Sequence, residues 1–192
     1  MEDLVFQKIG DTMTYCRSVS NQSIGLANAL LDCYPFKSHN HGDHTRCIVT
    51  PSGTSAISIS VHSLLLRHPH QSINVVRGSE LYSCTPKIFK YLAKIFQINL
   101  HTIDVNDSDA ILTLFQNLNN QINILFVESA SNSSGDIFDF TLIKKLRSMS
   151  KKLYVVVDNT WLTHIIFNPF DYDADIIVTS LTKYYTASAI IL

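Results

Sequence analysis

The chain has 192 residues, of which 46% are hydrophobic and 16% are charged, and its formal net charge is −1. That length and apolar content suffice for one domain with a hydrophobic core. A near-neutral charge without a basic run argues against a nucleic-acid partner. Apolar runs of about five residues fall far short of the roughly 20 that a membrane helix needs, and the polar N-terminus lacks a signal-peptide pattern, so we expect a cytoplasmic protein.

The first 45 residues predict an arm and a loop rather than a domain of their own. They contain one short helical stretch, 24–31, and then a polar stretch with His39, His41 and His44. Three histidines so close together could bind a metal ion. No cysteine or carboxylate spacing supports a defined site, so we favour a solvated loop and expect no metal.

From residue 46 onward, short apolar runs alternate with amphipathic stretches. Strands without strict in/out alternation are typical of a sheet covered on both faces, and their alternation with helices predicts right-handed βαβ units. We therefore expect an α/β domain over 46–192, with a mainly parallel sheet and helices on both faces. The predicted strands are 47–50, 73–76, 98–103, 122–127, 153–157 and 175–179, and the predicted helices are 54–66, 86–95, 107–118 and 140–150.

Residues that directly follow the predicted strands are the candidates for ligand binding, because ligands of such sheets bind at the carboxyl ends of the strands. Ser52, Gly53 and Thr54 lead from the first strand into a helix, where backbone N–H groups favour a phosphate. The alternative is an ordinary turn capped by Ser52 or Thr54. Tyr82 follows the second strand and could stack on a planar ligand, or it could simply anchor the next helix.

Later strand ends carry carboxylates, hydroxyls and a lysine. Glu128 ends an apolar strand, where a buried carboxylate is costly unless it is paired or solvated at a cleft. Asp158 could cap a turn or pair with a protonated ring nitrogen. Lys183 follows Ser180 and Thr182; a desolvated lysine amine is a nucleophile, whereas most lysines lie on the surface. Together, the strand ends offer the groups that pyridoxal phosphate requires.

Several segments in order resemble the trans-sulfuration (Cys/Met metabolism) family of pyridoxal-phosphate (PLP) enzymes, which includes cystathionine synthases and lyases and methionine γ-lyase. The most specific are the stretch from Val155 to Leu162 and the stretch from Thr179 to Tyr184 around the lysine. Weaker matches are Tyr15-Cys16-Arg17, Ser52-Gly53-Thr54 and Glu128-Ser129-x-Ser131-Asn132. The resemblance covers nearly the whole chain and implies the large PLP-binding domain of the fold-type I, aminotransferase-like architecture.

The resemblance also implies a role for each site residue. Lys183 would form the internal aldimine and later move protons, Asp158 would pair with the pyridine nitrogen, and Tyr82 would stack on the ring. Tyr15 and Arg17 would reach across a dimer interface to the phosphate of the neighbouring subunit. The phosphate would be held by Ser52, Gly53, Thr54, Ser180 and Thr182, and Asn132 and Thr160 would lie near the ring.

The implied function is elimination or replacement at the β- or γ-carbon of a cystathionine-, homoserine- or methionine-like amino acid, by a homo-oligomer with shared active sites. The family continues beyond the lysine with a last strand and a C-terminal domain that binds the substrate carboxylate. This chain stops at Leu192, soon after Lys183, and lacks the glycines that follow that lysine in the family. We therefore expect a missing C-terminal domain, and keep as the alternative an inactive homologue that binds PLP or a partner chain only.

Overall fold

The computed structural model describes residues 20–34, 45–118 and 121–185, and its centre is one parallel sheet of five strands in the order β2-β1-β3-β4-β5. The connections leave β1 and β3 in opposite directions, so the crevice between these two strands is a topological switch point, where ligands bind in open α/β sheets. The strands are β1 (Ile73–Gly78), β2 (Ile98–Ile103), β3 (Ile122–Glu128), β4 (Lys152–Asp158) and β5 (Ile176–Val178).

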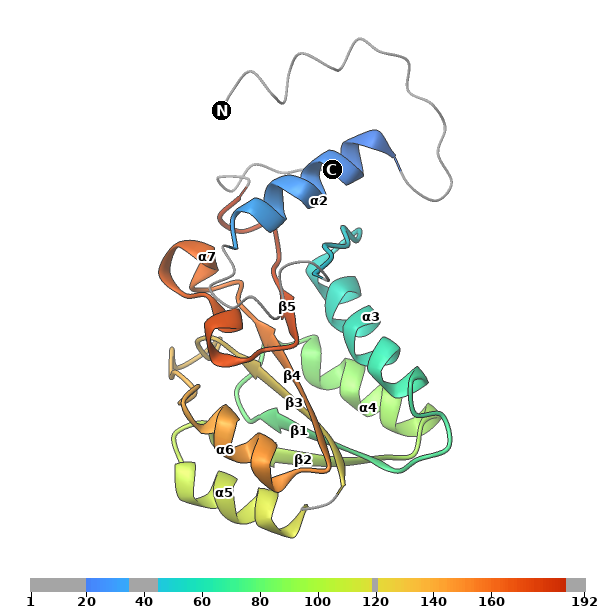
Figure 1. The fold of residues 1–192 in the computed structure, drawn as a ribbon, viewed down its shortest axis with the longest axis vertical. Coiled ribbons are helices and arrows are strands. Elements are labelled where there is room, and N and C mark those ends of the chain that lie inside the picture. The colour runs from blue at the N-terminus through green and yellow to red at the C-terminus, as the bar shows by residue number, and fades with distance from the viewer. Residues whose placement is uncertain (1–19, 35–44, 119–120, 186–192) are drawn as a thin grey trace.

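Helices cover both faces of the sheet, as Figure 1 shows, and this confirms the predicted α/β class. On one face, Val61 and Phe89 pack with Phe126 of β3, and on the other, Phe115 and Leu146 belong to the second buried cluster. The first face carries α3 (Gly53–Leu66) and α4 (Thr85–Ile95), and the second carries α5 (Ser108–Asn117) and α6 (Leu142–Met149).

Three further elements lie around the end of β5. The N-terminal helix α2 (Asn21–Asp32) lies next to α7 (Thr163–Ile166) at the top of Figure 1, and the 3₁₀ turn η2 (Pro169–Tyr172) leads into β5. Helix α2 is longer than the predicted stretch 24–31 because Ser20 and Ser23 cap each other's backbone N–H groups in a capping box.

The predicted strand over 47–50 is wrong. These residues have no regular secondary structure, and the side chain of Ile48 is 74% exposed. β-Branched residues favour extended backbone, but a strand forms only where a sheet edge supplies hydrogen-bond partners and a packed surface. The remaining predicted strands and helices exist, with ends shifted by a few residues. For example, α6 begins at Leu142 because the carboxylate of Asp139 accepts from the N–H and the hydroxyl of Thr141 and holds the preceding turn.

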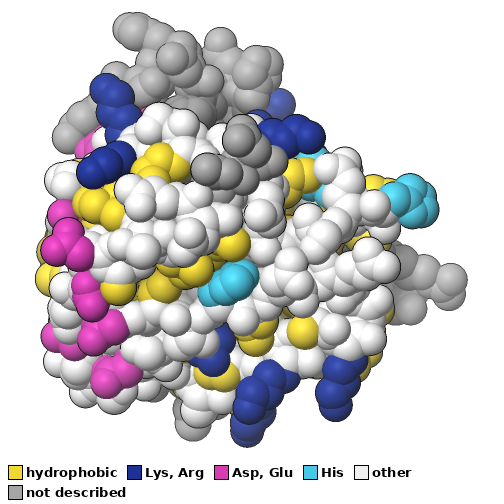
Figure 2. Space-filling view, turned by 90° about the horizontal axis from the view of Figure 1, so that it is seen from below, with side chains coloured by type: hydrophobic (Ala, Val, Ile, Leu, Met, Phe, Trp, Pro, Cys, Tyr) yellow, Lys and Arg dark blue, Asp and Glu magenta, His cyan; other side chains and the backbone are white. Residues whose placement is uncertain are grey.

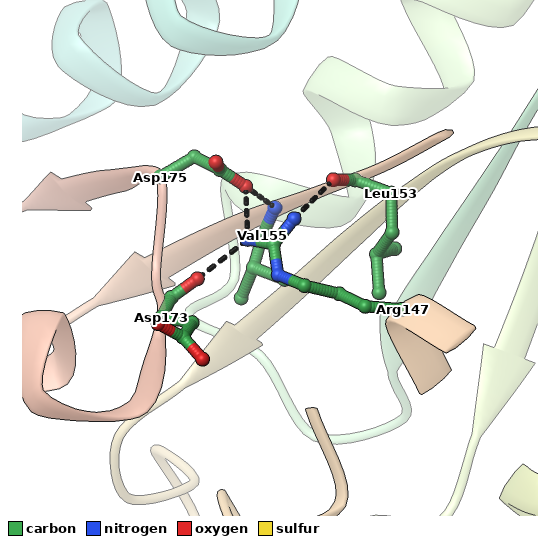
Figure 3. A network of polar contacts seen from close by, with 5 residues as sticks. All are labelled: Arg147, Leu153, Val155, Asp173 and Asp175. Atoms are coloured by element: carbon green, nitrogen blue, oxygen red, sulfur yellow. Dashed lines mark hydrogen bonds and ion pairs between the residues drawn. The ribbon is translucent and has the colours of Figure 1, made fainter. Parts of the chain in front are cut away.

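A network of hydrogen bonds and an ion pair at the edge of the sheet fixes β5 beside β4 (Figure 3). Arg147 of α6 donates to the carbonyl of Leu153 at 2.7 Å and to Oδ2 of Asp175 at 2.7 Å. The same carboxylate oxygen accepts from the N–H of Val155, and the N–H of Asp175 donates back to the carbonyl of Val155. The network therefore sets the register of β5 and the starting point of the segment that follows it.

Acidic and basic side chains occupy different parts of the lower surface of the molecule. In the view from below in Figure 2, Asp and Glu side chains gather along one side, whereas Lys and Arg side chains stand in separate small groups. The described part of that face therefore shows no continuous basic surface. Among the helices of the described residues, none has both the length and the apolar character to cross a membrane.

Candidate functional site

A cavity of about 550 Å³ opens at the carboxyl ends of the strands, beside the topological switch point. Every predicted site residue in the described part of the chain lines it. These residues are Ser52, Gly53, Thr54, Tyr82, Asn132, Asp158, Thr160, Ser180, Thr182 and Lys183. Tyr15 and Arg17 lie outside the described residues, as do His39, His41 and His44. A second cavity of about 370 Å³, at the amino ends of β1 and β2, contains none of the predicted residues.

Hydroxyl groups and a helix start meet at one end of the main cavity. Ser52 caps α3, and its Oγ accepts from the N–H of Ser55 at 3.1 Å. A Cβ atom on Gly53 would lie 2.9 Å from Cβ of Ser180, so only glycine allows the start of α3 to approach the loop after β5 this closely. In that loop, Oγ of Ser180 lies 2.9 Å from Oγ1 of Thr182. The N–H groups of a helix start, the helix dipole and these hydroxyls together suit a phosphate.

Asp158 provides a buried carboxylate at the end of β4, with 9% of the residue exposed. Its Oδ1 accepts from both the N–H and the hydroxyl of Thr160, at 3.0 and 2.6 Å. The hydroxyl of Thr160 in turn accepts from the N–H of Ser180 at 2.9 Å. Burial raises the pKa of Asp158, while the hydrogen bonds of Thr160 and the charge of Lys183 lower it. The carboxylate is thus rigidly oriented and can hold a cationic partner such as a protonated ring nitrogen.

Glu128 is a site residue to which the sequence prediction assigned no role. It stands beside Asp158 in the register of β3 and β4 and is 6% exposed. Its Oε1 accepts from the backbone N–H of Tyr82 at 2.6 Å, whereas Oε2 has no well-aligned hydrogen bond within the described residues. Burial raises the pKa of Glu128 to about 7; the charge of Asp158 also raises it, and the N–H groups of Tyr82 and Asn132 lower it. The signal in the sequence was the carboxylate that ends an apolar strand.

Apolar side chains complete the wall of the cavity, and sequence reasoning did not include them. Trp161 directly follows Thr160 and is 45% exposed, and Tyr184 directly follows Lys183 and is 57% exposed. Ile57 contributes from the first turns of α3. No local pattern distinguishes these residues from surface or core residues, because their role depends on the cavity that the strand ends create.

The residues present fit PLP in kind and in arrangement. The cavity has an anion site for the phosphate and a buried carboxylate for the ring nitrogen. It also has an aromatic side chain for the planar ring and a primary amine for the carbonyl carbon. Lys183 and Asp158 line the same cavity, and the positive charge of Lys183 lowers the pKa of the Asp158 carboxyl.

Comparison with known sequences finds one family. A sequence profile described as "Cys/Met metabolism PLP-dependent enzyme" matches residues 39–189. The chain is 30% identical over 137 residues to cystathionine beta-lyase of Schizosaccharomyces pombe, and 28% identical over 137 residues to L-methionine gamma-lyase of Fusobacterium nucleatum subsp. polymorphum. Each alignment covers 71% of this chain and 33% of the relative, so the chain spans about a third of the length of the curated relatives it matches.

Solved structures show the same fold. The structure of an O-acetylhomoserine (thiol)-lyase from Campylobacter jejuni, which contains N′-pyridoxyl-lysine-5′-monophosphate, matches with a TM-score of 0.65 and 25% identity, over 84% of this chain and 36% of that one. Cystathionine gamma synthase from Xanthomonas oryzae pv. oryzae matches with a TM-score of 0.70 and 23% identity, over 93% of this chain and 43% of that one.

Proposed function

Because the chain belongs to the Cys/Met metabolism family of PLP-dependent enzymes, we propose that its cavity binds pyridoxal 5′-phosphate covalently through Lys183. The observation that carries this proposal is the convergence of the predicted residues on one cavity, from strand ends far apart in the sequence. Lys183 is the primary amine of that cavity, and a lysine amine is the group that forms imines with carbonyl carbons.

The other residues of the cavity would hold the cofactor and orient it. Asp158 would keep a proton on the ring nitrogen, and Tyr82 would stack on the ring face. When bound, the cofactor supplies an electron sink for negative charge that develops at the α-carbon of an amino acid. Lys183, once released from the cofactor, would take and return the α-proton. The phosphate would be held by Ser52, Gly53, Thr54, Ser180 and Thr182, with Asn132 and Thr160 beside the ring.

We further propose that the reaction is an elimination or a replacement at the β- or γ-carbon of a cystathionine-, homoserine- or methionine-like amino acid. The names of the relatives support this substrate class, and they include lyases and a sulfhydrylase. The proposed assembly is a homo-oligomer in which residues 1–45 form an arm and residues 46–192 form the cofactor domain. Tyr15 and Arg17 of the arm would then bind the phosphate in the neighbouring subunit.

Reduction with borohydride tests the proposed cofactor site. The 192-residue chain is incubated with PLP, reduced, digested and mapped by mass spectrometry. We expect a reduced pyridoxyl adduct on the peptide with Lys183, its loss in Lys183→Ala, and its retention in Lys151→Ala, which changes an exposed lysine before β4. An adduct that persists in Lys183→Ala, or none in the unaltered chain, would contradict the proposal.

Release of a 2-oxo acid from cystathionine or methionine tests the proposed reaction. The substrates are added to the chain after the Lys183 adduct has been demonstrated, so that cofactor binding and turnover are separate results. Release that depends on Lys183 supports the enzyme. An intact adduct without release favours the alternative, a homologue that binds PLP or a partner chain and has no activity.

A further inference from the structure

Three aromatic side chains from distant parts of the chain meet beside the segment that carries Lys183. Tyr34 follows α2, His164 belongs to α7, and Tyr185 lies two residues after the lysine. Nδ1 of His164 is 2.6 Å from the hydroxyl of Tyr185, and their rings are 5.5 Å apart. The ring of Tyr34 meets the ring of His164 edge-on, with their centroids 5.8 Å apart.

Tyr34 also holds the other end of the same segment. Its hydroxyl lies 3.3 Å from Oγ1 of Thr179, the first residue after β5, and its ring packs edge-on against Phe170 of η2. Only 9% of Tyr34 is exposed, although it comes from the N-terminal part of the chain, where the sequence predicted an arm and a loop. The segment is therefore held at Thr179 by Tyr34 and at Tyr185 by His164, with Lys183 between these two points.

The segment needs such support because the strand before it is short. β5 has three residues and pairs, among the described strands, with β4 alone. The backbone N–H of Lys183 makes one hydrogen bond of 3.3 Å, to the carbonyl of Ser180. Few backbone hydrogen bonds and a short edge strand are features of segments that open easily. The amine must nevertheless stand at a defined place in the cavity if it is to react.

We propose that Tyr34, His164 and Tyr185 form an aromatic clasp that positions Lys183 at the cavity. None of the three lines the cavity, so they are positioning residues and do not touch the reacting atoms. The hydroxyl of Tyr185 stays protonated over the ordinary pH range, because burial and the neighbouring Tyr34 raise its pKa, and it can donate to Nδ1 of His164. The role of Lys183 rests on the proposed function, whereas the contacts of the clasp do not.

Two measurements on the full chain test the clasp, and the first needs no cofactor. Hydrogen exchange of the peptides that cover 176–185 is compared in the unaltered chain, Tyr185→Phe, His164→Ala and Tyr34→Ala. We expect exchange there to rise about tenfold, as for the loss of one buried hydrogen bond, while β1 to β3 stay unchanged. His164→Asn, which places an acceptor oxygen near the position of Nδ1, should recover part of the protection. Tyr91→Phe is the control, because Tyr91 lies exposed on α4.

The second measurement is the rate at which PLP attaches to Lys183, followed by borohydride trapping at timed intervals. The clasp variants should attach about tenfold more slowly, with His164→Asn intermediate, since a displaced amine reaches the carbonyl carbon less often. Attachment at the unaltered rate, or exchange that rises equally in β1 to β3, would overturn the clasp. If the unaltered chain forms no adduct, the proposed function fails, and hydrogen exchange alone decides the clasp: a local rise supports it and no rise overturns it.

Discussion

The carboxylate of Glu128 accepts a 2.6 Å hydrogen bond from the backbone N–H of Tyr82, and so joins the end of β3 to the loop after β1. β1 and β3 are adjacent in the sheet, and the chain continues from them in opposite directions, from β1 to β2 and from β3 to β4. Because ligands bind at this point of an open α/β sheet, one buried carboxylate fixes the aromatic wall of the cavity relative to the strand ends.

The stability of the chain should depend on pH through Glu128. Burial raises its pKa from 4.5 to about 7, so between these values the folded chain holds a proton that the unfolded chain has lost. The free energy of unfolding therefore falls as the pH rises from about 4.5 to about 7, by at most about 3 kcal/mol from this group. Glu128→Gln keeps an acceptor for the N–H of Tyr82 and removes the titration.

Urea unfolding between pH 5 and pH 8 measures this effect. The free energy of unfolding of Glu128→Gln, relative to the unaltered chain, should rise with pH across this range. Glu80→Gln is the matched control, because Glu80 is an exposed carboxylate in the loop that also holds Tyr82. If the free energy of unfolding of Glu128→Gln falls with pH as much as that of the unaltered chain, Glu128 is not the group that causes the pH dependence.

Gly53→Ala should separate α3 from the loop after β5. The added Cβ would lie 2.9 Å from Cβ of Ser180, and the required shift should cost about 1–3 kcal/mol of stability. Because both sides of the anion site move apart, the affinity for PLP should fall about tenfold or more. Trp161 is the chain's single tryptophan and lines the cavity, so its fluorescence reports binding.

Gly25→Ala is the natural comparison for Gly53→Ala. Gly25 lies inside α2, and within the described residues no atom beyond its chain neighbours and its own helix backbone is within 4 Å of the position that its Cβ would take. Alanine is the better helix former, so this change should be neutral or stabilise the chain by up to about 1 kcal/mol, without any effect on PLP affinity. Equal losses of stability and of PLP affinity in the two variants would show that the close approach of Gly53 to Ser180 does not determine either property.

Arg147→Ala should loosen β5 and the segment that follows it. The guanidinium joins the carbonyl of Leu153 to the carboxylate of Asp175, and its side chain is 30% exposed. We expect a loss of about 1–3 kcal/mol in the free energy of unfolding, since a buried carbonyl and a carboxylate lose their charged partner. Lys144→Ala changes an exposed residue of the same helix and should cost less than about 0.5 kcal/mol.

A buried row of asparagines at the opposite end of the sheet should stabilise the strand register. Asn74 of β1 is 1% exposed and donates to Oε1 of Gln121 at 2.7 Å and to Oδ1 of Asn123 at 2.9 Å. Asn74→Ala should cost about 2 kcal/mol, because the amide oxygen of the buried Asn123 loses the donor that Asn74 supplies. Asn99→Ala, at the exposed edge of the same row, should cost about 0.5 kcal/mol. If denaturant unfolding shows the same loss of stability for both variants, the buried hydrogen bond between Asn74 and Asn123 does not stabilise the sheet more than the exposed one does.

Much of the cavity could be predicted from the sequence because parallel strands end at one edge of a sheet. Once the apolar runs were assigned to strands, Asp158 and Lys183 had to lie at that edge. The failure at 47–50 shows the limit of the same reasoning, since an apolar run predicts extended backbone but not whether a sheet edge is available for it. Glu128 could be noticed, but its partner could not be identified, because Tyr82 follows a different strand.

The sequence by itself determined the parallel α/β sheet, the family and the groups at the strand ends, because these depend on periodicity, on order along the chain and on local motifs. Only the tertiary structure decided which groups touch. The bond of Glu128 to Tyr82, the approach of Gly53 to Ser180, and the meeting of Tyr34 with His164 each join residues far apart in the chain. Such contacts depend on strand register and helix packing, which are set by the whole core rather than by the residues that meet.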